Sequence, residues 1–272
     1  MESGELAGKV AALWRYPVKS MMGEEINSCE FTPRGLYGDR AYALSDTSSG
    51  KIASAKNPSK WPNLFKFRAS YVAPPQSDLS LPAARIMLPT GDTILSDQPD
   101  ADAVLSRELG RPVTILSSAP EHAELEEYWP DMEELTLKDT VTDEALPPGT
   151  FFDLAILHIL TTSTIESLRA LYPEGRFEVR RFRPNIVIDT GGAEAGFTES
   201  DWIGKEISFG DTVLKITGPC PRCVMTTLPQ YDLPKDPGIL RTAAKHNQAH
   251  VGVYASVVKS GRASIGDSIT LE

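Results

Sequence analysis

Short strand-like runs, each ended by proline, glycine or aspartate, occupy most of this chain of 272 residues. Residues 9–16 form one such run, which stops at Pro17, and residues 85–88 and 93–95 flank the turn sequence Pro89-Thr90-Gly91-Asp92. Runs of this length separated by turn residues are typical of antiparallel strands joined by tight connections. The chain is therefore expected to be an α+β, β-rich protein with two barrel-like β domains and a few short helices.

Three helices are expected between these strands. Residues 102–109 are followed by glycine, a common helix stop. Ser163 begins a second helix, because Glu166 three residues later completes a capping box. Asp236 and the proline after it start a third helix, which covers residues 239–246. The start of the second helix is open to two interpretations, an ordinary capped end or an anion site formed by its free amides.

An acidic, proline-containing stretch divides the chain. We place an N-terminal domain at residues 1–118, a connection at 119–149 and a second domain at 150–272. The connection is interpreted as an irregular surface segment with at most one helical turn, because Pro130, Pro147 and Pro148 interrupt it. Residues 151–160 are almost continuously apolar and are predicted to form a buried strand.

Charge and cysteine content exclude several classes of function. The formal net charge of −10 argues against general binding to nucleic acid or to an anionic membrane surface. Three cysteines in a chain of this length do not form a disulfide framework. No membrane-spanning run is present, and residues 1–8 lack the apolar segment of a signal peptide. A cytoplasmic location is expected.

The turn around Cys220 and Cys223 carries the strongest sign of chemistry. Pro219 and Pro221 are expected to break the preceding strand there, and Arg222 between the thiols favours a thiolate. The pair could be a redox dithiol, half of a zinc site or the source of a single soft metal ligand. The spacing alone leaves these alternatives open.

Basic and hydroxyl side chains elsewhere suit a phosphate-bearing ligand. Arg180, Arg181 and Arg183 form a basic cluster, which would either recognise phosphate or form surface salt bridges with the acidic connection. Together with the cysteine turn, such groups are compatible with a metal carried by a phosphorylated cofactor. The residues that could hold its phosphate and polar ring edges are Lys19, Ser20, Arg40, Thr162, Ser163, Arg183 and Asn185.

Four stretches together resemble the MOSC family, which is named after the C-terminal part of molybdenum cofactor sulfurase. They are Tyr16-Pro17-Val18-Lys19-Ser20, Gly35-Leu36-Tyr37-Gly38-Asp39-Arg40, Arg181-Phe182-Arg183-Pro184-Asn185-Ile186-Val187 and Cys220-Pro221-Arg222-Cys223-Val224-Met225-Thr226-Thr227. The resemblance covers essentially the whole chain, as an N-terminal MOSC β-barrel domain followed by the MOSC domain proper. It is strongest to the amidoxime-reducing branch of the family.

The resemblance implies a set of roles for individual residues. Cys223 would be the catalytic residue and the protein ligand to molybdenum in a molybdenum cofactor (Mo-molybdopterin), and Cys220 a supporting residue. The implied cofactor-binding residues are Lys19, Ser20, Arg40, Thr161, Thr162, Ser163, Arg183, Asn185 and Arg222. The implied reaction is the reduction of N-hydroxylated compounds, with loss of oxygen as water. Pyridoxal phosphate binding is a further property attributed to the family.

The resemblance implies two features that are not expected in this chain. They are the N-terminal membrane anchor of the mitochondrial relatives and the iron–sulfur domain that some bacterial relatives append. We therefore expect a separate electron-donor protein, cytochrome b5-like or ferredoxin-like, with residues 121–134 as its acidic docking surface. A non-catalytic carrier of the molybdenum cofactor or of sulfur is the alternative.

Overall fold

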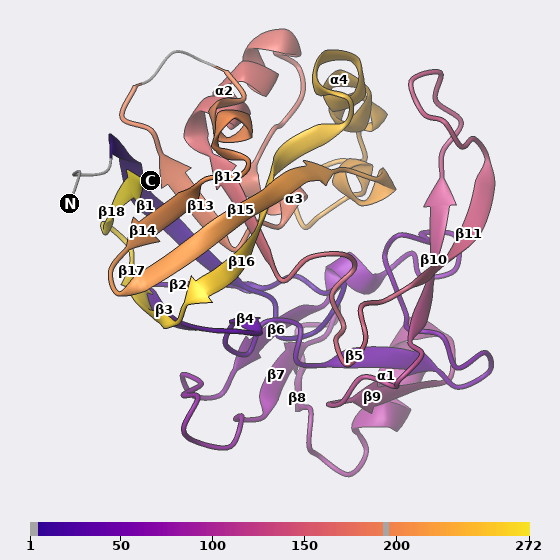
Figure 1. Cartoon of the computed structure of the whole chain (residues 1–272). Helices are drawn as coiled ribbons and strands as arrows, with labels where there is room; N and C mark the ends of the chain where they lie inside the picture. Colours follow the sequence, from indigo (N-terminus) through magenta and orange to yellow (C-terminus); the bar gives the residue numbers. More distant parts are fainter. Residues whose placement is uncertain (1–4, 193–195) are drawn as a thin grey trace.

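β strands predominate in the computed structural model, which describes residues 5–192 and 196–272 (Figure 1). The strands are β1 (Glu5–Arg15), β2 (Glu24–Ile26), β3 (Ser28–Thr32), β4 (Gly35–Leu36), β5 (Ala43–Asp46), β6 (Arg68–Tyr71), β7 (Ala84–Met87), β8 (Thr93–Leu95), β9 (Val113–Leu116), β10 (Glu124–Trp129), β11 (Thr140–Ala145), β12 (Leu157–Thr161), β13 (Ile186–Asp189), β14 (Glu206–Phe209), β15 (Thr212–Pro221), β16 (His250–Lys259), β17 (Gly261–Ser264) and β18 (Ser268–Leu271). The helices are α1 (Ala101–Leu109), α2 (Thr162–Leu171), α3 (Val179–Phe182) and α4 (Pro237–Asn247), with 3-10 turns η1 (Leu64–Lys66), η2 (Thr198–Trp202) and η3 (Val224–Thr227). The protein is thus β-rich with short helices, as expected.

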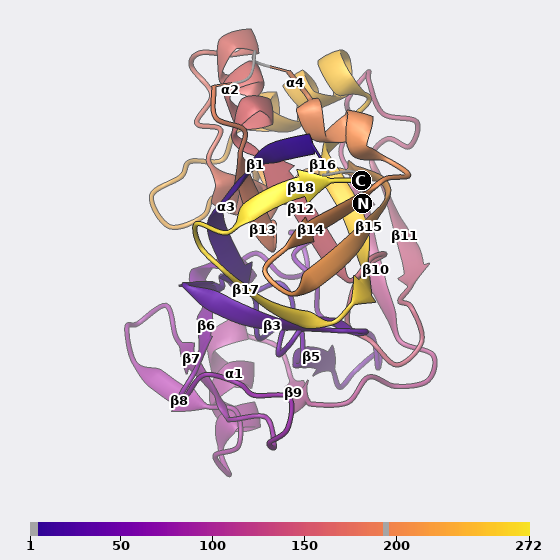
Figure 2. The ribbon, with the colours of Figure 1, turned by 60° about the vertical axis from the view of Figure 1, so that its left-hand side comes forward.

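One closed barrel of seven strands forms the C-terminal part. Its strand order is β13-β12-β16-β15-β14-β18-β1, and β1 pairs with β13 to close it. The closing strand comes from the N-terminal end of the chain and also pairs with β18 and β2 (Figure 2). Alternate residues of β13 point inward, so Ile186 and Ile188 join the barrel core. Val10 and Leu13 of β1 join the same core on either side of a register shift between Val10 and Ala12. Residues from the two ends of the sequence therefore share one core.

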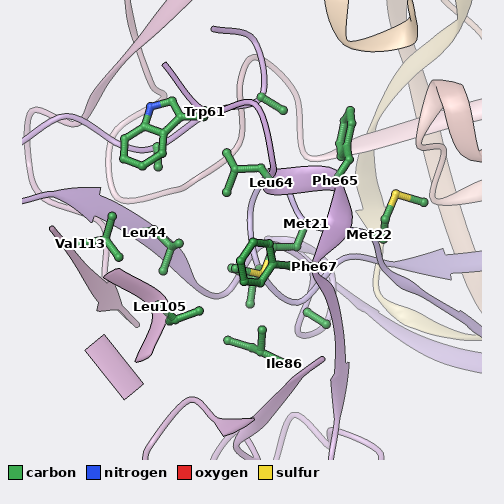
Figure 3. Close-up of a cluster of buried hydrophobic side chains, with 14 of the residues drawn as sticks. Met21, Met22, Leu44, Trp61, Leu64, Phe65, Phe67, Ile86, Leu105 and Val113 are labelled. Atoms are coloured by element: carbon green, nitrogen blue, oxygen red, sulfur yellow. The ribbon is translucent and has the colours of Figure 1, made fainter. Parts of the chain in front are cut away.

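The remaining strands form separate small sheets. The sheet β17-β3-β4 packs on the barrel core through Phe31, Leu36 and Ala263. The sheet β6-β7-β8 and the pair β5-β9 surround a second core. Within the described ranges these strands do not close into a second barrel. Aromatic and aliphatic side chains such as Trp61, Phe67 and Ile86 pack together in this core (Figure 3). The expectation of two barrel-like domains is thus confirmed only in part, by one closed barrel. The domain limits stay a prediction.

The acidic stretch is not an irregular connection. Strands β10 and β11 pair in register from Glu124 opposite Ala145 to Trp129 opposite Thr140, and together they form an antiparallel hairpin. Figure 1 shows this hairpin extending from the N-terminal sheets towards α4. The prediction of a loop was wrong because charged side chains occupy both faces, which hides the period-2 alternation of a strand.

Three local expectations also need correction. The apolar run at 151–160 is a strand only over β12, since residues 151–156 are irregular. Thr161, not Ser163, caps α2, and its side chain accepts a hydrogen bond from the Thr164 amide. Strand β15 continues through both prolines to Pro221, with register shifts against β16 that accommodate the missing amide hydrogens. The other two expected helices form as α1 and α4, with Gly110 and Asp236 as their caps.

Within residues 5–192 and 196–272, no helix combines the length and the apolar character needed to cross a membrane.

Candidate functional site

A cavity of about 340 Å³ lies between the barrel and the N-terminal sheets. Its wall is built from short segments that lie far apart in the sequence, including the loop after β1, the hairpin β10–β11 and the end of β15. The predicted site residues on this wall are Lys19, Ser20, Arg40, Arg183, Asn185, Arg222 and Cys223. The volume suits a small organic ligand or cofactor.

Basic side chains dominate the charge of the wall. Five basic residues line the cavity, namely Lys19, Arg40, Lys56, Arg183 and Arg222. Three acidic residues accompany them, namely Glu127, Glu144 and Asp153. In a protein with a net charge of −10, this concentration of cationic groups marks the cavity as a site for an anionic ligand.

Three cavity residues have strained backbone conformations. The φ angles of Ser20, Arg40 and Arg183 are 63°, 46° and 54°, in the left-handed region that side chains other than glycine rarely occupy. Such conformations cost about 1–3 kcal/mol each and persist where the surrounding structure holds them. Their concentration in one cavity supports a functional site.

A buried carboxylate and a tyrosine ring fix two of the guanidinium groups. Asp39 pairs with Arg40 and accepts hydrogen bonds from Asn185 Nδ2 (2.9 Å) and the Tyr16 amide (2.7 Å). The guanidinium carbons of Arg40 and Arg183 lie 4.5 and 4.2 Å from the centre of the Tyr16 ring. Burial lowers the pKa of Arg183 to about 10, which still leaves it charged at neutral pH. The site is thus rigid and cationic.

Lys19 and Lys56 share the carboxylate of Asp153. Lys19 Nζ pairs with Asp153 and also donates to the carbonyl oxygen of Phe151 at 2.6 Å. Lys56 Nζ lies 2.8 Å from Glu127 Oε2 and 3.7 Å from Asp153 Oδ2. Although burial opposes ionisation of Asp153, the two ammonium groups hold its pKa well below the usual range. These charges therefore balance one another in part.

Cys223 stands where the two cores meet. It directly precedes η3, whose Val224 and Met225 pack into the N-terminal core. Its side chain is partly exposed on the cavity wall. Burial, and next the carboxylate of Glu127, raise the pKa of this thiol to about 11. In the protein alone, Cys223 is therefore a protonated thiol at neutral pH.

Cys220 has the opposite electrostatic environment. Arg222 Nη1 donates to its sulfur at 2.8 Å, and His158 and Tyr254 are close. Burial opposes ionisation, but Arg222 and then His158 outweigh it and lower the pKa of Cys220 to about 6. Cys220 is thus the thiolate of the unliganded protein, held by an arginine.

One buried nitrogen of a cavity-lining side chain, Arg222 Nε, has no hydrogen-bond partner among the described residues. Buried polar atoms are normally satisfied, so this nitrogen fits a polar ligand that binds nearby. His158, which is only 5% exposed, lies beside the Cys220 sulfur. In the described residues, no three His, Cys, Asp or Glu side chains are grouped to hold a metal ion. The donor set, one accessible thiol among cationic groups, fits a metal bound to an anionic organic cofactor.

Comparison with protein-family models matches both parts of the chain. Residues 149–270 match the MOSC domain, and residues 7–103 match the MOSC N-terminal β-barrel domain. The chain belongs to the MOSC family.

Known relatives share this domain pair at low identity. The MOSC chain is 24% identical to the mitochondrial amidoxime reducing component 2 of Rattus norvegicus over 96% of its own length and 82% of the relative's. It is 25% identical to the human protein of the same name, over 96% and 83% of the two chains. Among solved structures, the YuaD protein from Bacillus subtilis aligns with a TM-score of 0.49 and 12% identity, covering 97% and 94% of the two chains.

Three predicted cofactor-binding residues of the MOSC domain do not line the cavity. Thr161, Thr162 and Ser163 lie at the far end of β12 and the start of α2. There, the buried Glu199 carboxylate accepts hydrogen bonds from Thr161 Oγ1 (2.5 Å) and Thr164 Oγ1 (2.6 Å). A carboxylate of the protein itself therefore lies at the helix start that we considered as an anion site.

The basic cluster also separates into different roles. Arg180 pairs with Glu178 and Asp232 rather than with the acidic stretch. Arg181 is fully buried and donates to backbone carbonyl oxygens, whereas Arg183 reaches the cavity. Of the three arginines, Arg183 is thus the one that lies where it could bind a phosphate in the cavity.

Several wall residues of this MOSC protein were missed from the sequence. They are Lys56, Glu127, Trp129, Glu144, Asp153, His158 and Tyr254. The hairpin residues were missed with the hairpin itself. Asp39 could have been found from the sequence, because it directly precedes Arg40, a predicted cofactor-binding residue, in the motif Gly38-Asp39-Arg40.

Proposed function

We propose that this MOSC protein is a molybdenum-cofactor-dependent reductase of N-hydroxylated compounds, with the Cys223 thiolate as the protein ligand to molybdenum. The observation that carries the proposal is an accessible cysteine on the wall of a cavity lined by five basic side chains. The names of the relatives, amidoxime reducing components, indicate the reaction class. When bound, the cofactor supplies two-electron redox chemistry.

Different residues of the cavity wall are proposed to bind different parts of the cofactor. Arg40, Arg183 and Arg222 provide guanidinium groups for the phosphate and polar ring edges of the cofactor. Cys223 is protonated before binding, because its pKa is about 11, so coordination to a metal requires release of that proton. Cofactor uptake at Cys223 is therefore expected to be favoured by raising the pH.

Electrons are proposed to come from a separate cytochrome b5-like or ferredoxin-like protein in the cytoplasm. Glu121 and Glu124 lie exposed at the base of the hairpin, and Glu133 lies exposed near its tip, where the neighbouring Glu134 pairs with Arg241. These carboxylates offer a negative surface for a donor with basic residues around its redox group.

The test is reduction of benzamidoxime by protein produced in a host that makes the cofactor, with a strong artificial reductant. Cys223→Ala is expected to lower kcat by at least about a thousandfold, because the metal loses its only protein ligand. Cys29→Ala is the matched control, since Cys29 is a buried thiol of the barrel core outside the cavity. Full activity of Cys223→Ala would overturn the assignment.

Two other results would support different functions. Cofactor retention without turnover under any reductant would favour a carrier of the cofactor or of sulfur. Equal loss of activity in Cys220→Ala and Cys223→Ala, without loss of molybdenum, would favour a dithiol redox protein.

A further inference from the structure

The hairpin presents one face to the cavity. Residues directly opposite each other in an antiparallel pair share a face, so Leu125 with Glu144, and Glu127 with Thr142, point the same way. Glu127, Trp129 and Glu144 from this face line the cavity. The hairpin therefore forms an acidic and aromatic part of a wall that is otherwise largely basic.

Glu144 differs from the other two carboxylates of the wall. Glu127 pairs with Lys56, and Asp153 pairs with Lys19. Across residues 5–192 and 196–272, Glu144 forms no ion pair, and its Oε1 accepts only the Thr142 hydroxyl at 2.7 Å. Its negative charge remains available to a ligand in the cavity.

Trp129 is fixed beside this charge. Its indole Nε1 donates to Thr142 Oγ1 at 2.9 Å, and the same hydroxyl donates to Glu144. Thr142 thus holds both the indole and the carboxylate in one hydrogen-bonded chain. Phe152 adds a second aromatic ring to the cavity wall.

The hairpin is anchored at both ends. At its base, Leu125 packs with Ile52 and Phe151 in a buried cluster. At its tip, Met132 packs against Leu240 of α4. Trp129 and Glu144 are therefore parts of a supported wall, which is what selective binding requires.

We propose that Trp129 and Glu144 form the part of the cavity that receives the organic portion of the substrate, and that they select aromatic N-hydroxylated compounds carrying a positively charged group. A carboxylate without a basic partner attracts a cation, and an indole ring adds cation–π and stacking contacts. The inference rests on the proposed function, because that function defines the reacting group. It adds the charge and shape of the rest of the substrate.

The kinetic test compares two benzamidoximes that differ only in the para substituent, one with a trimethylammonium group and one with a carboxylate. Wild-type protein is expected to prefer the cationic compound in kcat/KM, and Glu144→Gln to reduce that preference about tenfold. Glutamine keeps an oxygen for the Thr142 hydroxyl, so the variant removes charge rather than the hydrogen-bonded chain.

Trp129→Ala is expected to lower kcat/KM for the cationic compound, and Trp129→Phe to restore part of the loss.

Asp143→Asn is the matched control, because Asp143 lies next to Glu144 on β11, is exposed and does not line the cavity. It is expected to keep the wild-type preference. An unchanged preference in Glu144→Gln, or an equal drop in Asp143→Asn, would overturn the proposal.

A binding measurement separates this inference from the proposed function. Calorimetry with phenyltrimethylammonium and with benzoate needs no turnover. Preferential binding of the cation that depends on Glu144 would support the hairpin's role even if benzamidoxime were not reduced. Reduction of benzamidoxime with equal binding of both probes would leave the proposed function standing and refute the selectivity.

Discussion

At Gly252 the backbone of β16 passes so close to His158 that no side chain fits. A Cβ placed there would lie 2.2 Å from His158 Nε2 and 2.5 Å from the carbonyl oxygen of Ile159, and φ is +82°. His158 Nε2 is in turn 3.0 Å from the carbonyl oxygen of Val251. Glycine at this position therefore allows the imidazole to lie between strands, beside the Cys220 sulfur.

Gly252→Ala is predicted to destabilise the protein more than Gly266→Ala. Both glycines have similar positive φ angles, but nothing lies within 4 Å of a Cβ added at Gly266. The shared backbone strain costs about 1–2 kcal/mol, and the clash at Gly252 adds about 1–3 kcal/mol. Urea unfolding of the two variants measures the difference. Equal losses of unfolding free energy would show that His158 does not need this space.

The three cysteines are predicted to titrate far apart. Burial raises the pKa of Cys29 to about 12, Cys223 has a pKa of about 11, and Cys220 a pKa of about 6. Because the pKa of Cys220 is lowered, its thiolate forms as pH rises through about 6, and the stability it contributes is lost as pH falls from the unfolded value towards 6. Ultraviolet thiolate absorbance of cofactor-free protein should show one thiolate gained between about pH 5 and 8. The step should vanish in Cys220→Ser and persist in Cys29→Ser. A step that persists in Cys220→Ser would contradict the assignment.

At the scale of elements, the sequence predicted helix ends correctly where they depend only on residues close by in the chain. Gly110 ends α1 with φ +67°, and Asp236 caps α4 by accepting from the Gly238 amide. The hairpin β10–β11 depends instead on partners distant in the sequence. Glu127 is a buried acidic residue only because Lys56 pairs with it, and no local rule supplies that partner. The apolar side chain of Phe151 likewise reflects packing against Leu125 of the hairpin, although Phe151 itself is not part of a strand.

Met132→Ala is predicted to loosen the hairpin, whereas Leu137→Ala is not. Both residues belong to the segment that links β10 to β11, but Met132 is 6% exposed against α4 and Leu137 is 40% exposed. Removing the buried side chain costs about 2 kcal/mol or more, and removing the exposed one less than about 0.5 kcal/mol. Amide hydrogen exchange in residues 124–145 should accelerate in Met132→Ala alone. Unchanged exchange would mean that the tip contact does not hold the hairpin.

At the scale of the whole molecule, the site exists because two cores meet. Strand β1 closes the barrel, and the loop after it carries Lys19 and Ser20 into the cavity. η3 packs into the N-terminal core and carries Cys223 to the same place. No spacing in the sequence reveals that proximity. Resemblance to the family grouped these residues, but it also grouped Thr161–Ser163, which the structure places elsewhere.

The distribution of charge also belongs to this scale. The chain carries 37 acidic and 27 basic residues, yet the cavity has more basic than acidic side chains. Two of its three carboxylates form ion pairs, and the one that forms none within residues 5–192 and 196–272 comes from the hairpin. A basic cavity in an acidic protein attracts anionic ligands to that place, which supports the proposed phosphorylated cofactor.

X-ray absorption spectroscopy at the molybdenum edge tests the central claim most directly, because it counts the sulfur atoms around the metal in the loaded protein. The dithiolene of the cofactor supplies sulfur in every variant, and Cys223 is proposed to add one more. Wild-type and Cys29→Ser proteins should therefore show one sulfur neighbour more than Cys223→Ser, which keeps a hydroxyl in place of the thiol. An identical sulfur count in Cys223→Ser and wild type would contradict the account.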